Sequence, residues 1–157
     1  MKKLYFLLLI AVVLFTQACQ SDDDNQDNLS GFERISDRDF VLTDFLVRAN
    51  GAPINTFRDL LDCDIDNITR YESSGAAISE EGLLKCDPQD PQTITFFWTL
   101  ISNDSKLIVD FGGPNLDVFN ILLNDGNRLI LESLTIEDID GDNREESIIR
   151  TFTYERI

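Results

Sequence analysis

Catalytic chemistry has few residues to draw on in this chain, because its 157 residues include no histidine. Serine and cysteine triads use a histidine as general base, and most catalytic zinc sites use histidine ligands. Carboxylates are the plentiful reactive groups, with 29 Asp and Glu residues against 13 Lys and Arg residues. We therefore expect a protein that is not an enzyme; the alternative is a hydrolase that works with paired carboxylates.

One acidic segment has the spacing of a calcium-binding loop. Asp138, Asp140 and Asp142 place oxygens at the first, third and fifth positions of the pattern that begins an EF-hand loop. Such a loop normally closes with a bidentate Glu at its twelfth position, where this chain has Ile149. We therefore expect an acidic, solvated loop and no cofactor, with calcium as the alternative.

Cys19 is the cysteine whose surroundings are most informative. Two lysines precede an apolar run over 4–15, and Ala18 stands directly before Cys19. A membrane span needs about 20 apolar residues, so this shorter run predicts a secretory signal. We interpret 1–18 as a lipoprotein signal peptide and Cys19 as the residue that carries the lipid chains, palmitate among them. The alternative is an ordinary signal peptide that ends in a chance cysteine.

This interpretation also predicts where the protein is located. Membrane lipid is the expected partner through acylated Cys19, and the expected location is the outer membrane, at its periplasmic face or at the cell surface. Loss of two lysines with the signal peptide leaves 11 basic and 29 acidic side chains, which changes the formal charge from −16 to −18. A domain this acidic repels the phosphate backbone, so we expect no nucleic-acid partner.

Cys63 and Cys86 remain as a pair once Cys19 is lipidated. A signal peptide places them in an oxidising compartment, where a disulfide is the default expectation. The alternative is two separate free thiols. A metal site would need further ligands that the sequence does not identify.

An acidic, polar segment follows Cys19 and offers almost nothing that a core could bury. We predict that 19–37 is the lipidated cysteine followed by a disordered tether. Its acidic cluster at 21–24 is either a solvating linker or a signal that sends the protein to the cell surface.

The remaining segment, 38–157, must position the candidate residues, and it has the pattern of one all-β domain. Short runs rich in β-branched and aromatic residues alternate with turn residues. One helix is predicted over 53–61, because Pro53 stands near its start and apolar residues follow at helical spacing. The predicted strands are 40–48, 65–72, 77–78 with its neighbours, 83–86, 93–102, 106–111, 118–123, 128–137 and 147–155. About eight antiparallel strands in up-and-down order can close into a barrel that is filled or holds one small ligand.

Alternation along these strands predicts which side chains share a face. Phe96 and Trp98 share a face of one strand, and Arg150 and Phe152 share a face of another. We take these four as candidate ligand-binding residues, with core packing as the alternative for the aromatic ones. If Arg150 is buried, it meets either a ligand carboxylate or an internal acidic residue.

The order of these features resembles the lipocalin-like-domain lipoproteins of diderm bacteria. The resemblance rests on the segment from Cys63 to the turn at 73–75, on Cys86, and on the aromatic strand at 95–100 with the hairpin strands that follow it. It implies a meander barrel over most of 38–157 but transfers no ligand. We therefore expect a lipid-anchored extracytoplasmic barrel that binds a small apolar or amphipathic molecule. The alternative is a structural or interaction lipoprotein with a filled barrel that acts through its surface.

Overall fold

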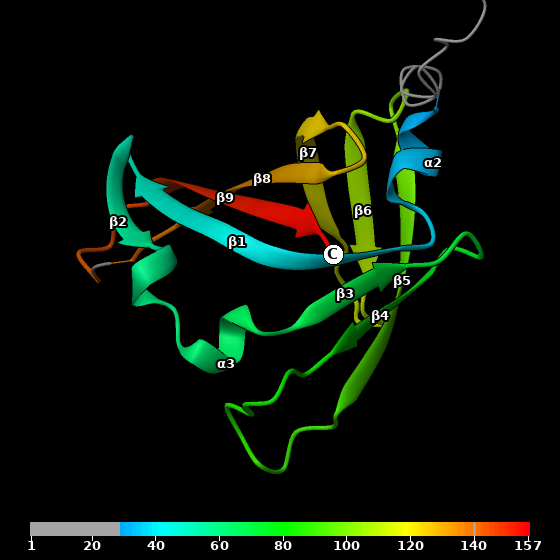
Figure 1. Ribbon diagram of the computed structural model, residues 1–157. Helices are drawn as coiled ribbons and strands as arrows, with labels where there is room; N and C mark the ends of the chain where they lie inside the picture. The colour runs from blue at the N-terminus through cyan, green and yellow to red at the C-terminus, as the bar shows by residue number, and fades with distance from the viewer. Residues whose placement is uncertain (1–28, 140) are drawn as a thin grey trace, which may run out of the picture.

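A computed structural model of the chain describes residues 29–139 and 141–157 (Figure 1). The predicted signal peptide, Cys19, the acidic cluster at 21–24 and Asp140 lie outside these residues. The predictions made for them therefore remain predictions. In the described part of the chain, no helix is both long enough and apolar enough to cross a bilayer.

Nine antiparallel strands form one sheet that closes on itself (Figure 1). They are β1 (Arg38–Ala49), β2 (Ala52–Thr56), β3 (Ile68–Tyr71), β4 (Ala76–Glu80), β5 (Thr93–Ile101), β6 (Lys106–Asp110), β7 (Asp117–Asn124), β8 (Arg128–Glu137) and β9 (Glu146–Arg156). From β3 to β9 each strand pairs with the next in the chain, and β1 pairs with both β3 and β9. Eight strands thus make a closed up-and-down barrel, the lipocalin-like architecture that the sequence predicted.

The predicted alternation of buried and exposed side chains is confirmed in β5 and β6. Phe96 and Trp98 are buried, whereas Phe97 between them is 63% exposed. Leu107 and Val109 on the neighbouring strand are also buried. Because side chains alternate across a strand, this pattern fixes which face of each strand points into the barrel.

The predicted tether is wrong in its last residues, because Gly31–Ile35 forms helix α2. The Ser30 hydroxyl accepts a hydrogen bond from the Glu33 amide at 3.2 Å, and the Glu33 carboxylate accepts one from the Ser30 amide at 2.8 Å. This reciprocal capping box satisfies two amides that a helix start otherwise leaves unpaired. The hydrogen bonds that the Ser30 amide and the Ser30 hydroxyl donate to the Glu33 carboxylate lower the pKa of Glu33.

Helix α2 covers one end of the barrel (Figure 1). Ile35 is fully buried there, and the Phe32 ring stacks on the Trp98 ring with centroids 5.0 Å apart. The Asn124 side-chain amide donates to the Gly31 carbonyl at 2.8 Å and so holds the helix to β7. We call this end of the barrel the cap, and it includes α2 and the turns at 72–75, 102–105 and 124–127.

The opposite end, which we call the mouth, carries the longer connections. It consists of the segment 57–67 and the loops at 81–92, 111–116 and 138–145. The predicted strand at 83–86 lies in one of these loops and is wrong, since Leu83 there is fully exposed and has no strand to pair with. The predicted strand at 65–72 begins later, at Ile68, because α3 (Asp62–Ile65) precedes it.

The predicted helix at 53–61 is also wrong. Asn50 and Gly51 both have positive φ, 49° and 86°, which suits a tight hairpin turn. That turn sends β2 back along the end of β1, where Ala52 pairs with Ala49. Strand pairing therefore overrides the helical spacing, and the helical conformation within 53–61 is limited to the short 3-10 turn η2 (Phe57–Asp59).

Candidate functional site

A cavity of about 230 Å³ lies inside the barrel. Its lining comes from each strand from β3 to β9 and from the start of the loop after β6: Thr69, Tyr71, Ser79, Ile94, Phe96, Val109, Phe111, Phe119, Leu131 and Tyr154. Sites for drug-sized ligands usually measure about 300–1,000 Å³, so this cavity suits a smaller molecule.

The depth of the cavity follows from where its lining residues stand on their strands. Ile94, near the mouth end of β5, is 42% exposed, whereas Tyr71, at the cap end of β3, is only 5% exposed. Below Tyr71 the barrel is filled, because its ring meets the Trp98 ring edge-on with centroids 5.3 Å apart. The cavity therefore opens toward the mouth and has its floor next to the cap.

Most of the cavity wall is apolar. Phe96, Val109 and Leu131 are all buried, and the Phe111 ring packs against the Phe96 ring with centroids 4.8 Å apart. In the described residues, no Asp, Glu, Lys or Arg lines the cavity. An ionised guest would thus lose its hydration without meeting an opposite charge, which is unfavourable.

Four lining residues carry hydroxyl groups, namely Thr69, Tyr71, Ser79 and Tyr154. Burial raises the pKa of Tyr154 to about 12, and it raises the pKa of Tyr71 further, with a smaller contribution from nearby Tyr154. Both phenols therefore stay protonated at any physiological pH. They are available as hydrogen-bond donors inside an apolar cavity.

Of the four residues predicted to bind a ligand, Phe96 is the one that lines the cavity. Trp98 instead packs in the cap, where its indole N–H donates to the Glu72 carbonyl at 3.0 Å. Phe152 packs on the Phe45 ring with centroids 5.1 Å apart. Both residues contribute to the core around the cavity rather than to its surface.

Arg150 is only partly buried, so the condition attached to its predicted role is not met, and its partner Glu137 is a partly exposed residue with 42% of its side chain accessible. Its guanidinium donates to the two carboxylate oxygens of Glu137 at 3.2 and 3.1 Å and to the Thr135 hydroxyl at 2.7 Å. The hydrogen bond from Arg150 is the main cause that lowers the pKa of Glu137. This group lies at the mouth end of β8 and β9 and is not part of the cavity lining.

The acidic loop at 138–145 uses its carboxylates to hold its own backbone. Asp138 accepts from the amides of Gly141 and Asn143 at 2.8 and 2.9 Å, and Asp142 accepts from the Arg144 amide at 2.8 Å. Asp140, the third predicted calcium ligand, lies outside the described residues. For this loop, the absence of a cofactor stays the prediction and calcium binding stays its alternative.

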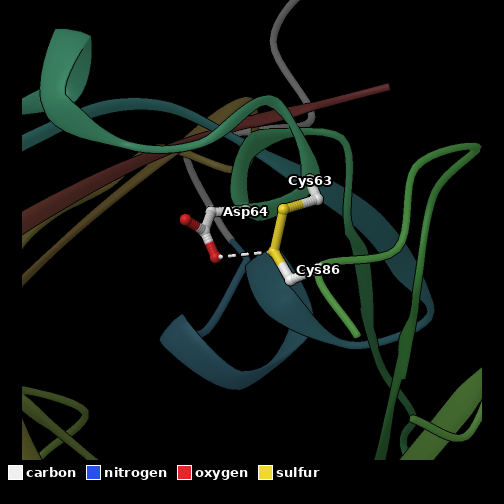
Figure 2. A group of neighbouring side chains, drawn as sticks. All are labelled: Cys63, Asp64 and Cys86. Carbon is white, nitrogen blue, oxygen red and sulfur yellow. Dashed lines mark hydrogen bonds between the residues drawn. A yellow bond between two sulfur atoms is a disulfide. The ribbon is translucent and has the colours of Figure 1, made fainter. Parts of the chain in front are cut away.

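The predicted disulfide between Cys63 and Cys86 is confirmed, with the two Cα atoms 5.3 Å apart (Figure 2). It joins α3 to the loop between β4 and β5. Asp64 Oδ1 lies 3.4 Å from Cys86 Sγ, a contact in which the sulfur donates no proton because a disulfide carries none. Since each sulfur is bonded to the other, this group offers no thiolate to a metal.

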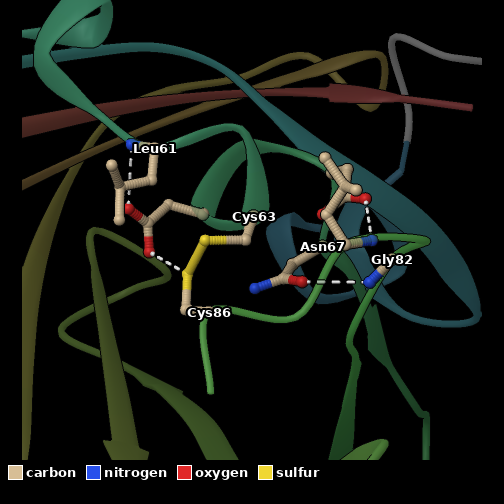
Figure 3. The surroundings of a disulfide bond; sticks show 8 residues. Leu61, Cys63, Asn67, Gly82 and Cys86 are labelled. Atoms are coloured by element: carbon tan, nitrogen blue, oxygen red, sulfur yellow. Dashed lines mark hydrogen bonds between the residues drawn. A yellow bond between two sulfur atoms is a disulfide. The ribbon is translucent and has the colours of Figure 1, made fainter. Parts of the chain in front are cut away.

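Hydrogen bonds from backbone amides to side-chain oxygens fix the same loop on the other side of the disulfide (Figure 3). Asn67 Oδ1 accepts from the Gly82 amide at 3.1 Å, and Asp66 Oδ2 accepts from the Leu84 amide at 3.0 Å. A Cβ at Gly82 would overlap the Asp66 carboxyl group, so this close approach requires glycine. The mouth is therefore held by covalent and polar links at its rim.

A second hollow, a groove of about 400 Å³, lies on the outside of the barrel over β5 and β6. Phe97, Ile108 and Leu116 supply its apolar surface, and Phe97 and Leu116 are 63% and 53% exposed. This groove shares no lining residue with the internal cavity. It is the feature of the outer surface that fits the alternative prediction of action through the surface.

Sequence reasoning did not single out Tyr71 and Tyr154. The signal for Tyr154 is its spacing two residues after Phe152, which places both on one face of β9. Tyr71 has no such signal, because the predicted strand begins three residues before the observed β3 and the sequence does not define which way Tyr71 faces.

Comparisons with known proteins find a weak structural similarity. No protein-family model matches this sequence, and no curated protein matches it. Among solved structures, the chain is similar to a bovine odorant binding protein, a deswapped triple mutant, at 14% sequence identity and a TM-score of 0.40. The match covers 78% of this chain and 73% of that chain. The barrel assignment rests on the strand pairing described above and not on this likeness.

Proposed function

We propose that this protein is a lipid-anchored, extracytoplasmic barrel that acts by binding one small apolar or amphipathic molecule. The cavity of about 230 Å³ carries the proposal. A closed barrel of eight strands has room either for its own side chains or for one small ligand. Here the cap half is filled with side chains and the mouth half is not, so the mouth half is the place for a ligand.

Lipid anchoring is supported by the residue pattern around Cys19. Two or more acyl chains hold a protein stably on a membrane, whereas one gives marginal binding. The Cys19→Ser variant should therefore move from the membrane fraction to the soluble fraction of the host. Membrane association that survives this substitution would contradict the anchor.

Ligand binding can be tested with the uncharged fluorophore α-naphthylamine, whose emission rises in apolar surroundings. We would use the full-length chain with Cys19→Ser, folded under oxidising conditions, so that no lipid chain competes for the probe. We expect a saturable signal with one probe per chain. Val109→Phe should weaken it at least tenfold, because the larger ring occupies cavity space.

The matched control is Ile108→Phe. Ile108 is the neighbour of Val109 on β6 but faces the outer groove, so the same increase in side-chain size falls on the opposite face of the strand. Binding lost with Val109→Phe and kept with Ile108→Phe supports the internal cavity. The reverse pattern would favour the outer groove, and with it the alternative that the protein acts through its surface.

A further inference from the structure

Tyr71 and Tyr154 approach the cavity from two strands that flank β1. Tyr71 on β3 pairs with Arg38 of β1, and Tyr154 on β9 pairs with Leu42 of β1. Phe40, on β1 between those two positions, is 1% exposed and belongs to the core. The two phenol rings therefore reach the same cavity from either side of a filled position near its floor.

Neither tyrosine hydroxyl has a hydrogen-bond partner among the described residues, although Tyr71 is only 5% exposed. Buried tyrosines normally place the hydroxyl against an acceptor or an ordered water. In the described part of the chain, the fully enclosed side-chain atoms that lack a partner all belong to other residues. Both hydroxyls thus keep some accessible surface, which the cavity supplies.

The charged groups nearest the barrel walls are already engaged elsewhere. Arg70 is paired with Asp39 at 2.6 Å, Arg38 donates to the Gly126 carbonyl at 3.2 Å, and Arg150 is held by Glu137. No cation among the described residues is left facing the cavity to neutralise an anionic guest. The cavity therefore combines apolar walls, four hydroxyl groups of which two are the phenols near its floor, and no counter-charge.

We propose that the ligand is an uncharged molecule with an apolar body and a carbonyl-type oxygen, which the hydroxyls of Tyr71 and Tyr154 receive near the cavity floor. This inference rests on the proposed ligand-binding function and adds the chemical class. The carbonyl oxygen has two lone pairs and can accept from both phenols. An apolar molecule without an acceptor leaves both phenols unpaired, and a carboxylate loses hydration without gaining a cation.

Three probes of nearly equal size and shape test the proposal by calorimetric titration. Acetophenone carries the carbonyl, isopropylbenzene replaces it with a methyl branch, and benzoate replaces the acetyl group with a charged carboxylate. With the full-length Cys19→Ser chain, acetophenone should bind tighter than isopropylbenzene by about threefold to tenfold for each hydrogen bond formed. Benzoate should bind weakest of the three.

The tyrosines are then changed to phenylalanine singly and together. Each Tyr→Phe change keeps the ring and removes the hydroxyl, so the double variant Tyr71→Phe/Tyr154→Phe should bind acetophenone and isopropylbenzene equally. Thr95→Val is the control, since it removes an exposed hydroxyl from β5 of the same barrel and should leave the preference unchanged. Unfolding of each variant by urea, followed through Trp98, shows that the barrel is retained.

The outcomes separate this inference from the proposed function. A preference for acetophenone that disappears in the double variant supports both. Three results would each overturn the proposed chemical class while ligand binding itself stands. They are equal binding of acetophenone and isopropylbenzene by the protein with both tyrosines, a preference for acetophenone that survives in the double variant, and tightest binding of benzoate. Failure of all three probes and of α-naphthylamine to bind overturns the proposed function and the inference with it.

Discussion

The two ends of this barrel are built from the same strands and differ in how their space is used. At the cap, α2 brings Ile35 and Phe32 onto Trp98, and the interior is filled. At the mouth, the interior holds the cavity, and order comes from the disulfide and from loop hydrogen bonds at the rim. The cap therefore supplies packing energy to the fold, while the mouth leaves part of the interior unfilled.

The connections at the two ends differ accordingly. The turns at the cap are short and join neighbouring strands as hairpins. Side chains from those strands therefore contact one another at the cap. The mouth loops are longer, which leaves the barrel open and puts a covalent link where packing is thin. Binding sites are commonly placed on loops that a rigid scaffold positions, and this division agrees with that rule.

The largest expected effect comes from the cap. Ile35→Ala should lower the free energy of unfolding by about 2–5 kcal/mol, because it leaves a cavity at a fully buried position. The measurement is urea unfolding followed by the fluorescence of Trp98, which is the chain's single tryptophan and lies beside α2. Ile54→Ala, at a position 53% exposed, is the control and should change stability by about 0.5 kcal/mol or less. Equal small losses in the two variants would show that α2 is not part of the folding unit.

Removal of the disulfide sharpens the description of the mouth. The double variant Cys63→Ser/Cys86→Ser should lose about 3 kcal/mol, the value expected for a loop of this size in the chain-entropy model. Hydrogen exchange should become faster at the amides of Gly82 and Leu84, while the amide of Trp98 in the cap half should respond much less. Uniform acceleration over both ends would contradict the separation between cap and mouth.

The last expected effect is absent at neutral pH and concerns the floor of the cavity at alkaline pH. Tyrosine in the unfolded chain ionises near pH 10, whereas burial holds the pKa of Tyr154 near 12 and that of Tyr71 higher. Above pH 10 the unfolded state therefore releases protons that the folded state retains, so stability is complete below pH 10 and falls as pH rises toward 12. The slope should approach about 1.4 kcal/mol per pH unit for each such tyrosine.

Tyr154→Phe tests this slope directly. The variant should show a shallower loss of stability between pH 10 and 12 in urea unfolding at a series of pH values, because one of the two ionising groups is gone. Thr95→Val serves as the control, with the slope unchanged. An identical slope in Tyr154→Phe and the unsubstituted protein would show that this phenol ionises in the folded state as readily as in the unfolded chain.

Prediction from the sequence worked best where a pattern is local. Alternation predicted that Phe96 and Trp98 share one face of their strand, because side-chain direction repeats every two residues, and the structure buries both while Phe97 between them is exposed. The disulfide was predicted by counting cysteines, since a lipidated Cys19 leaves one pair. The candidate site was predicted less well. Of the four proposed ligand-binding residues, Phe96 lines the cavity. Trp98 instead packs in the cap, and Arg150 forms an ion pair with Glu137.

The predictions that failed depended on contacts between distant parts of the chain. The segment 31–35 was predicted to be part of the tether because the residues that bury it belong to the distant strands β5 and β7. The hydrogen bond from Asn124 to Gly31, for example, spans 93 positions. The helix predicted at 53–61 gave way to β2 because the end of β1 offered strand hydrogen bonds that local spacing does not reveal.

The sequence by itself determined the all-β class, the inward and outward faces of the central strands and the cysteine pair, since composition and period-two alternation are local properties of the chain. The tertiary structure decided which end of the barrel is filled and which is hollow. It also decided that Tyr71 and Tyr154, 83 positions apart, share one cavity. The physical reason is closure of the sheet. Pairing of β1 with both β3 and β9 brings side chains from opposite ends of the chain together in one interior.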